Sequence, residues 1–211
     1  MTRIKLCGLR RPEDIAAANA LKPEYVGFVF ARKSRRYVTP EEALALKRLL
    51  DPGIKAVGVF VNEAPEKVAA LLVSGVIDLA QLHGEEDEDY LRQLRRLAPN
   101  PIIQAFRIRG ESDMREIESS SADYVLLDSG AGTGNLFDWA LTRSLRRPYF
   151  LAGGLNADNA ERAVRLLRPF GVDVSSGIET DGRKDAGKMA AFVEAVRRAA
   201  RGSEAPPVSE R

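Results

Sequence analysis

The sequence is short of the residues on which most metal and redox sites depend. It has one cysteine, Cys7, and one histidine, His83, among 211 residues. A single cysteine cannot form an internal disulfide, and there is no Cys/His cluster of the kind that holds structural zinc. Because disulfides mark oxidising compartments, a cytoplasmic, reducing compartment is the simplest expectation.

An excess of charge of either sign is also lacking. The 32 basic and 30 acidic residues leave a formal net charge of +2. Nucleic-acid binders concentrate unbalanced positive charge, so we expect no nucleic-acid partner. Apolar runs such as 56–61 are far too short to cross a bilayer, and the first residues lack the apolar stretch of a signal peptide. We therefore expect no membrane partner.

What the sequence does contain is a regular alternation of short apolar runs with longer segments of helical period. Eight such units, at roughly 25 residues each, predict an α/β fold, a single-domain (β/α)8 barrel of the TIM type. The expected strands are Ile4–Cys7, Tyr25–Phe30, Ala56–Val61, Leu79–His83, Ile102–Arg107, Tyr124–Asp128, Tyr149–Ala152 and Val172–Ser175. A doubly wound open sheet is the alternative that periodicity alone does not exclude.

The barrel is expected to occupy residues 1–201. Residues 202–211 contain two prolines and no apolar periodicity, so we expect them to form a disordered tail.

Two expected strands end in a residue that can move a proton, Cys7 and Asp128. Parallel α/β folds place their chemistry at these strand ends, so the pair is a candidate base and acid. The alternative for Cys7 is a small apolar core residue, and for Asp128 a cap on the following loop. Lys5 lies on the same strand face as Cys7 and would favour its thiolate, or it could pair with Asp173 on the last strand.

Glycine-bearing loops follow the last two expected strands, at Gly153-Gly154 and at Ser175-Ser176-Gly177. In barrels of this type these loops often bind phosphate through backbone N–H groups. The simpler alternative is a pair of tight turns.

Two further segments carry candidates for binding or proton transfer. The run 32–36 is mostly a solvated basic loop, but one arginine in it could turn inward and hold a carboxylate through two hydrogen bonds. His83 ends a strand after Gln81, and either an acid–base role or a structural hydrogen bond fits it.

Short motifs along nearly the whole chain, in order, resemble those of the phosphoribosylanthranilate isomerase family of tryptophan biosynthesis. The matching segments are Lys5–Leu9, Gly27–Phe30, Lys33–Tyr37, Val57–Asn62, Gln81–Gly84, Leu126–Ser129, Gly132–Gly134, Phe137–Trp139, Ala152–Asn156 and Val172–Glu179. Several short motifs at consistent positions are much stronger than any one of them.

The resemblance implies a (β/α)8 enzyme that converts N-(5'-phosphoribosyl)anthranilate to a 1-deoxyribulose 5-phosphate product without metal or organic cofactor. By the family's pattern Cys7 is the base, Asp128 the acid, and Arg36 the anchor of the anthranilate carboxylate. The two glycine-bearing loops would bind the phosphate, and Asp173 is a weaker candidate for the sugar hydroxyls. Gln81 and His83 would support the site. The partner is a small phosphoribosyl molecule, and the chain would be a monomer or a homodimer.

Two alternatives stay open from the sequence. One is a histidine-pathway aminoaldose isomerase, which resembles a two-aspartate enzyme, whereas this chain has Cys7 at the first strand. The other is a non-catalytic barrel that binds a phosphorylated ligand, which would be expected to lack the acid or the base.

Overall fold

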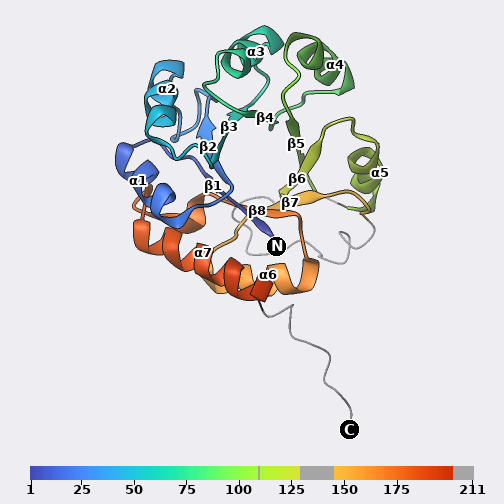
Figure 1. Ribbon diagram of the computed structural model, residues 1–211. Helices are drawn as coiled ribbons and strands as arrows, with labels where there is room; N and C mark the ends of the chain where they lie inside the picture. The colour runs from blue at the N-terminus through green and yellow to red at the C-terminus, as the bar shows by residue number, and fades with distance from the viewer. Residues whose placement is uncertain (109, 129–144, 202–211) are drawn as a thin grey trace.

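Eight parallel strands close into a barrel, and helices surround it, in the computed structural model (Figure 1). The structure describes residues 1–108, 110–128 and 145–201. The barrel strands are β1 (Arg3–Cys7), β2 (Tyr25–Val29), β3 (Lys55–Phe60), β4 (Leu79–Leu82), β5 (Ile102–Arg107), β6 (Tyr124–Asp128), β7 (Tyr149–Ala152) and β8 (Gly171–Val174). This arrangement confirms the predicted barrel and rules out the open sheet, because β1 pairs with both β2 and β8.

The described helices lie outside the barrel, and each follows one of its strands along the chain. They are α1 (Pro12–Leu21), α2 (Pro40–Leu49), α3 (Pro65–Val73), α4 (Glu88–Leu97), α5 (Glu111–Ser119), α6 (Ala157–Leu167) and α7 (Ala186–Arg201). A short 3-10 helix, η2 (Ser176–Ile178), follows β8. The sequence predicted about eight helices, and the segment between β6 and β7 in which another would fall lies largely outside the described residues.

Local sequence explains where several helices begin. Thr39 accepts a hydrogen bond from the Glu42 backbone N–H, and the Glu42 carboxylate accepts one from Thr39 in return. Asn156 caps α6 by accepting from Asp158 and Asn159. These reciprocal caps satisfy backbone donors that a helix start leaves without partners.

The strand boundaries differ from the sequence prediction by one residue at several ends. The predicted ends Phe30 and His83 lie just beyond β2 and β4, although both still donate a backbone hydrogen bond to β3. Similarly, β3 ends at Phe60 and β8 at Val174. Pairing stops where the chain turns away from the sheet at the barrel mouth, a boundary that periodicity locates only approximately.

The strands are buried on both faces, as in other parallel sheets covered by helices. Inside the barrel, aromatic rings fill the end at which the strands begin. Phe150 packs edge-on against Tyr25, Tyr124 and Phe170, with ring centroids 5.3 to 5.9 Å apart. This packed floor leaves the opposite end, where the strands finish, for binding.

The sequence did not predict a small antiparallel hairpin after η2. Strands β9 (Glu179–Thr180) and β10 (Arg183–Lys184) are joined by Asp181 and Gly182. Both turn residues have positive φ, at 50° and 73°, as the tight hairpin turn requires. The hairpin lies at the mouth of the barrel, next to β1.

Candidate active site

Cys7 closes β1 at the barrel mouth, where it is buried. Its partner on β2 is Gly27, and a Cβ placed on that glycine would lie 2.7 Å from the thiol sulfur. The absence of a side chain at Gly27 therefore makes room for the thiol. Gly8 follows with φ of +79°, which turns the chain out of the strand.

Opposing effects act on the ionisation of Cys7. Burial raises the pKa of its thiol, and the carboxylate of Asp173 acts in the same direction. The ammonium groups of Lys5 and Lys184 lower it, but they do not outweigh burial. In the free protein the thiol form is therefore favoured, with two cations close enough to stabilise a thiolate once it forms.

Lys5 has both of the roles that the sequence left open. It is fully buried and pairs with Asp173 at 3.0 Å, through register partners on β1 and β8. Burial works against its charged form, but Asp173 and Cys7 together raise the pKa of the ammonium. The ion pair closes the barrel beneath the thiol, and it occupies one oxygen of the carboxylate considered for the sugar hydroxyls.

Asp128 closes β6 and is linked to β4 through the only histidine of the chain. His83 Nε2 lies 3.4 Å from Asp128 Oδ2, and His83 Nδ1 lies 3.0 Å from Gln81 Nε2. Gln81 is buried, so its amide fixes one side of the imidazole ring. The structure thus brings Asp128, His83 and Gln81 together into one row of polar groups. The row runs from β4, which carries Gln81 and leads into His83, past the end of β5 to Asp128 on β6.

Cys7 and Asp128 lie at the same end of the barrel but not side by side. In the closed strand order, β7 and β8 separate β6 from β1 on the shorter path. Both residues therefore border one mouth from different directions, an arrangement that lets a base and an acid act on different atoms of one ligand.

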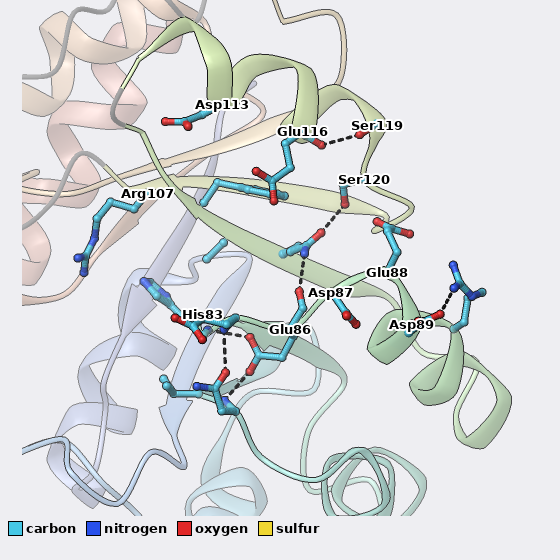
Figure 2. Close-up of a pocket in the computed structure, with 18 residues that line it drawn as sticks. His83, Glu86, Asp87, Glu88, Asp89, Arg107, Asp113, Glu116, Ser119 and Ser120 are labelled. Atoms are coloured by element: carbon cyan, nitrogen blue, oxygen red, sulfur yellow. Dashed lines mark hydrogen bonds and ion pairs between the residues drawn. The ribbon is translucent and has the colours of Figure 1, made fainter.

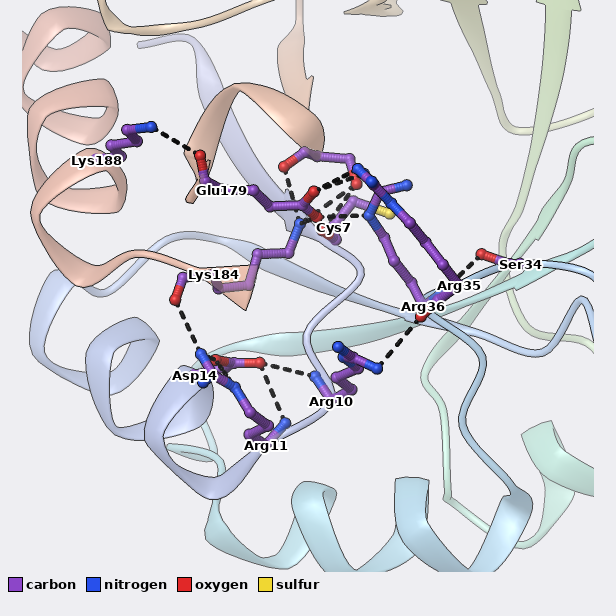
Figure 3. A network of polar contacts seen from close by, with 11 residues as sticks. Cys7, Arg10, Arg11, Asp14, Ser34, Arg35, Arg36, Glu179, Lys184 and Lys188 are labelled. Carbon is purple, nitrogen blue, oxygen red and sulfur yellow. Dashed lines mark hydrogen bonds and ion pairs between the residues drawn. The ribbon is translucent and has the colours of Figure 1, made fainter. Parts of the chain in front are cut away.

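Arg36 turns inward from the basic loop, as one arginine of that loop was predicted to do. Its aliphatic stem passes over Gly8, where an added Cβ would lie 2.4 Å from Arg36 Cδ. The guanidinium donates to both carboxylate oxygens of Glu179, from Nε at 2.6 Å and from Nη2 at 2.9 Å (Figure 3). Arg36 is therefore already held by a carboxylate of the protein itself.

The sequence analysis missed Glu179 and Lys184, which are buried in this network. Glu179 also accepts from Arg35 at 2.7 Å and from Lys184 at 2.8 Å. Burial works against the charged form of this carboxylate, but Arg36 and Lys184 outweigh burial and lower its pKa to about 2. The Asp181-Gly182 pair is a recognised hairpin signal, and it could have placed these two flanking charges opposite one another.

The two glycine-bearing loops that were predicted to bind phosphate lie against each other. A Cβ on Gly177 would lie 1.9 Å from the Leu155 carbonyl oxygen, so only glycine permits this contact. Gly153 and Gly154 have φ of 88° and 63°. Ser175 joins the loops to the thiol strand, since its hydroxyl donates to the Cys7 carbonyl at 3.2 Å.

A separate pocket of about 900 Å3 opens beside His83, over the ends of β4 and β5 (Figure 2). Its lining is rich in carboxylates, including Glu85, Glu86, Asp87 and Glu116. An acidic wall of this kind repels a phosphorylated ligand, so the pocket does not compete with the Cys7 side of the mouth as a phosphate site. Among the residues that the structure describes, no three metal-ligating side chains are grouped to hold a metal ion.

Comparison with known proteins agrees with this geometry. The family model described as N-(5'-phosphoribosyl)anthranilate (PRA) isomerase matches residues 4–195. The chain belongs to this family. A family member from Thermoanaerobacter sp. (strain X514) is 44% identical over 204 residues, covering 93% of this chain and 98% of its own.

Solved structures of the family share the fold. A phosphoribosyl anthranilate isomerase in complex with reduced 1-(o-carboxyphenylamino)-1-deoxyribulose 5-phosphate has a TM-score of 0.84 and 36% identity, covering 94% of this chain and 100% of its own. A structure of monomers generated from the dimeric phosphoribosylanthranilate isomerase of Thermotoga maritima has a TM-score of 0.82 and 36% identity, covering 93% of this chain and 99% of its own.

Family membership decides between the activities left open by the sequence. The matches favour the isomerase of tryptophan biosynthesis over the histidine-pathway enzyme and the non-catalytic barrel. Two of the motifs that carried the resemblance, 132–134 and 137–139, lie outside the described residues. Among the described helices, none combines the length and the apolar character needed to cross a bilayer.

Proposed function

We propose that this protein catalyses the Amadori rearrangement of N-(5'-phosphoribosyl)anthranilate, with Cys7 as base and Asp128 as acid. The observation that carries the assignment of roles is the placement of these two groups. A thiol and a carboxylate border one barrel mouth at the ends of β1 and β6, within the segment that matches the isomerase family.

The reaction needs one proton donor and one proton acceptor at different atoms of the substrate. Asp128 protonates the furanose ring oxygen while the lone pair of the anthranilate nitrogen expels it, which opens the ring to an iminium ion. Cys7 as thiolate then removes the proton from sugar C2. The electron pair of the broken C–H bond forms the C1–C2 double bond, and the iminium nitrogen becomes neutral. The resulting enolamine tautomerises to the ketone, so the overall change is an isomerisation.

The surroundings of each group suit its role. Lys5 and Lys184 stabilise the thiolate that Cys7 must become. His83, held by Gln81, contacts Asp128 and fixes the position from which that carboxyl meets the ring oxygen. We assign Gln81 and His83 a supporting role, and His83 is the next candidate for the acid.

The remaining predicted residues bind the substrate at its two anionic ends. Arg36 anchors the ring carboxylate, and the loops at 153–154 and 175–177 bind the phosphate through backbone N–H groups and serine hydroxyls. Asp173 has one oxygen bonded to Lys5, which leaves the other as a weaker candidate for a sugar hydroxyl.

The partner is thus a single small phosphoribosyl molecule, and the reaction as written calls for no cofactor. We place the protein in the cytoplasm as a monomer or a homodimer. The dimeric Thermotoga maritima family member supports the second possibility, and light scattering of the purified chain would decide between them.

Turnover of N-(5'-phosphoribosyl)anthranilate tests the proposal. The substrate is generated in place from anthranilate and phosphoribosyl pyrophosphate by a separate transferase, and the loss of its fluorescence is compared with spontaneous decay. Wild-type protein should accelerate that loss, and Cys7→Ala should abolish the acceleration while keeping a near-normal melting temperature. No acceleration by folded wild-type protein would reject the activity, and joint loss of folding and activity in the variant would make Cys7 a core residue.

A further inference from the structure

The hairpin β9–β10 presents a buried pair of opposite charges to the site. Glu179 and Lys184 are register partners, and their side chains are 5% and 2% exposed. The hairpin is held on the barrel by Arg11, which donates to the Lys184 carbonyl at 2.9 Å, and by Lys188, which donates to the Glu179 carbonyl at 2.8 Å (Figure 3). Such a pair is fixed in place rather than free to follow a ligand.

Glu179 takes one of the two edges through which a guanidinium can bind a carboxylate. Its oxygens accept from Nε and Nη2 of Arg36 at 2.6 and 2.9 Å. The other edge, formed by Nη1 and the second hydrogen of Nη2, is not used by Glu179. A planar guanidinium held along one edge has its other edge pointed in a set direction, because the fork is rigid.

The stem of Arg36 limits that direction further. It crosses directly over Gly8, with Cδ where a Cβ of that residue would lie, next to Cys7. With the stem over Gly8 and one edge on Glu179, the guanidinium has little rotational freedom left. A ligand that binds the second edge therefore does not have to order a long flexible side chain, which is one of the entropic costs of binding.

Lys184 keeps Glu179 from cancelling the positive charge that an anionic ligand would meet. Its ammonium donates to Glu179 Oε1 and to the Ser175 carbonyl, both at 2.8 Å. Arg35, Arg36 and Lys184 surround one carboxylate, so the cluster stays net positive. The same ammonium links the hairpin to the loop that begins at Ser175.

We propose that Glu179, supported by Lys184, is a positioning residue that aims the second edge of Arg36 at the carboxylate on the aromatic ring of the substrate. This inference rests on the proposed function and adds a specificity element to it. Glu179 itself does not touch the substrate; it acts through Arg36.

Binding of two ligands that differ only in the ring carboxylate tests this role. One is reduced 1-(o-carboxyphenylamino)-1-deoxyribulose 5-phosphate, and the other is the same compound with a plain phenylamino group. Dissociation constants are measured by calorimetry for wild type, Glu179→Gln, Arg36→Met and the double variant. Thr180→Ala, on the same hairpin but outside the Arg36 network, is the matched control.

Glu179→Gln should weaken binding of the carboxylated ligand about tenfold and change that of the plain ligand less than about twofold, since a loosened Arg36 matters only to a carboxylate. The double variant should bind no more weakly than Arg36→Met, because the two side chains act as one unit. Turnover by Glu179→Gln should show a raised KM with kcat nearly kept. Thr180→Ala should leave both dissociation constants unchanged.

Three results would overturn the role. Equal weakening of both ligands would make the hairpin a structural support of the whole site. Tighter binding of the carboxylated ligand would make Glu179 a competitor for Arg36, and unchanged binding would make it irrelevant to Arg36. If Glu179→Gln does not fold, Glu179→Asp tests the same point, because its shorter carboxylate keeps the charge but loses the two-bond reach.

Wild-type turnover separates this proposal from the activity on which it rests. Wild type that rearranges the substrate while Glu179→Gln binds both ligands normally rejects only the positioning role. Wild type with no turnover rejects the proposed function and, with it, the assignment of the aromatic carboxylate.

Discussion

Cys7 is the residue at which burial and charge oppose each other most directly. Its thiol lies against Gly27 inside the mouth, where burial favours the neutral form, yet two lysines favour the thiolate. A buried thiol with no cationic neighbours would be an inert core group. With Lys5 and Lys184 nearby, the thiol of Cys7 is a weak acid whose thiolate is stabilised by two cations that are already in place.

The first prediction concerns the ionisation of this thiol. Because the pKa of Cys7 is raised, thiolate is scarce at neutral pH, and its amount should still be rising at alkaline pH, beyond the point at which a free thiol has titrated. The rate of alkylation by iodoacetamide, measured against pH, reports the thiolate fraction of Cys7 alone, since the chain has no other cysteine. Lys184→Met should shift the curve to still higher pH, because Lys184 lowers this pKa. A midpoint below the ordinary thiol value would contradict the prediction.

The second prediction concerns Asp128. Asp128→Asn should lower kcat by about 10²- to 10⁴-fold, because an amide cannot supply the proton to the ring oxygen. The side chain is about the same size, so the melting temperature and the affinity for the reduced product analogue should stay close to wild type. Stopped assays of substrate fluorescence measure kcat. Near-normal turnover would instead assign the acid to His83.

At the scale of elements, the mouth is formed by the ends of strands that are far apart in the sequence and by the hairpin β9–β10, which follows the last barrel strand. Arg36 and Glu179 are 143 residues apart, and Lys5 and Asp173 are 168 apart. Each pair is brought together only by closure of the barrel. The site is therefore a property of the strand order and not of any local segment.

The third prediction concerns acid stability and the hairpin β9–β10. The pKa of Glu179 is about 2 in the folded protein and higher in the unfolded chain, so the unfolded chain takes up its proton first as pH falls. Glu179 therefore stabilises the fold above its unfolded pKa, and this contribution is lost as pH falls toward about 2.

Urea unfolding between about pH 6 and about pH 2.5 measures this effect. The free energy of unfolding of wild type should fall more steeply with acid than that of Glu179→Gln, which has no proton to gain at this position. Glu161→Gln is a matched control, because that carboxylate is also paired with arginines but lies on the outside of the barrel. Parallel curves for wild type and Glu179→Gln would show that the network does not stabilise the fold.

The elements were predictable to different degrees. The eight strands follow from apolar runs of four to six residues, because parallel strands buried on both faces have few polar positions. The ends Cys7 and Asp128 follow from the same runs. The hairpin did not, since strands of two residues show no periodicity. The partner of Arg36 was also out of reach, because a contact across 143 residues has no local signal.

On the scale of the whole molecule, the two ends of the barrel have different roles. Aromatic rings close the end at which strands begin, and polar groups such as Arg36, His83 and Asp128 border the end at which they finish. Gly171 lies next to Phe150, where an added Cβ would come within 2.5 Å of the ring. Stability therefore depends on the floor together with the larger core between strands and helices, and chemistry depends on the mouth.

The fourth prediction separates these two ends. Phe150→Ala should lower the free energy of unfolding by about 3–5 kcal/mol, because a large buried side chain leaves a cavity among rings that cannot all collapse into it. At a temperature well below its melting point, kcat/KM should stay within about threefold of wild type. Chemical denaturation and steady-state kinetics on one preparation measure both. A large loss of kcat/KM in folded protein would mean that the floor shapes the mouth.

The pairing of β1 with β8 has a consequence for how the protein is made. The strand that carries Cys7 is synthesised well before its partner at Gly171–Val174, because the register partners Lys5 and Asp173 are 168 residues apart. At about 5–20 residues per second, one edge of β1 waits roughly ten to thirty seconds for that partner. Lys5 spends the same interval without Asp173, and a charged edge residue discourages pairing with another chain. Until the ion pair with Asp173 forms and the barrel closes, the ammonium of Lys5 therefore disfavours pairing of the open edge of β1 with another chain.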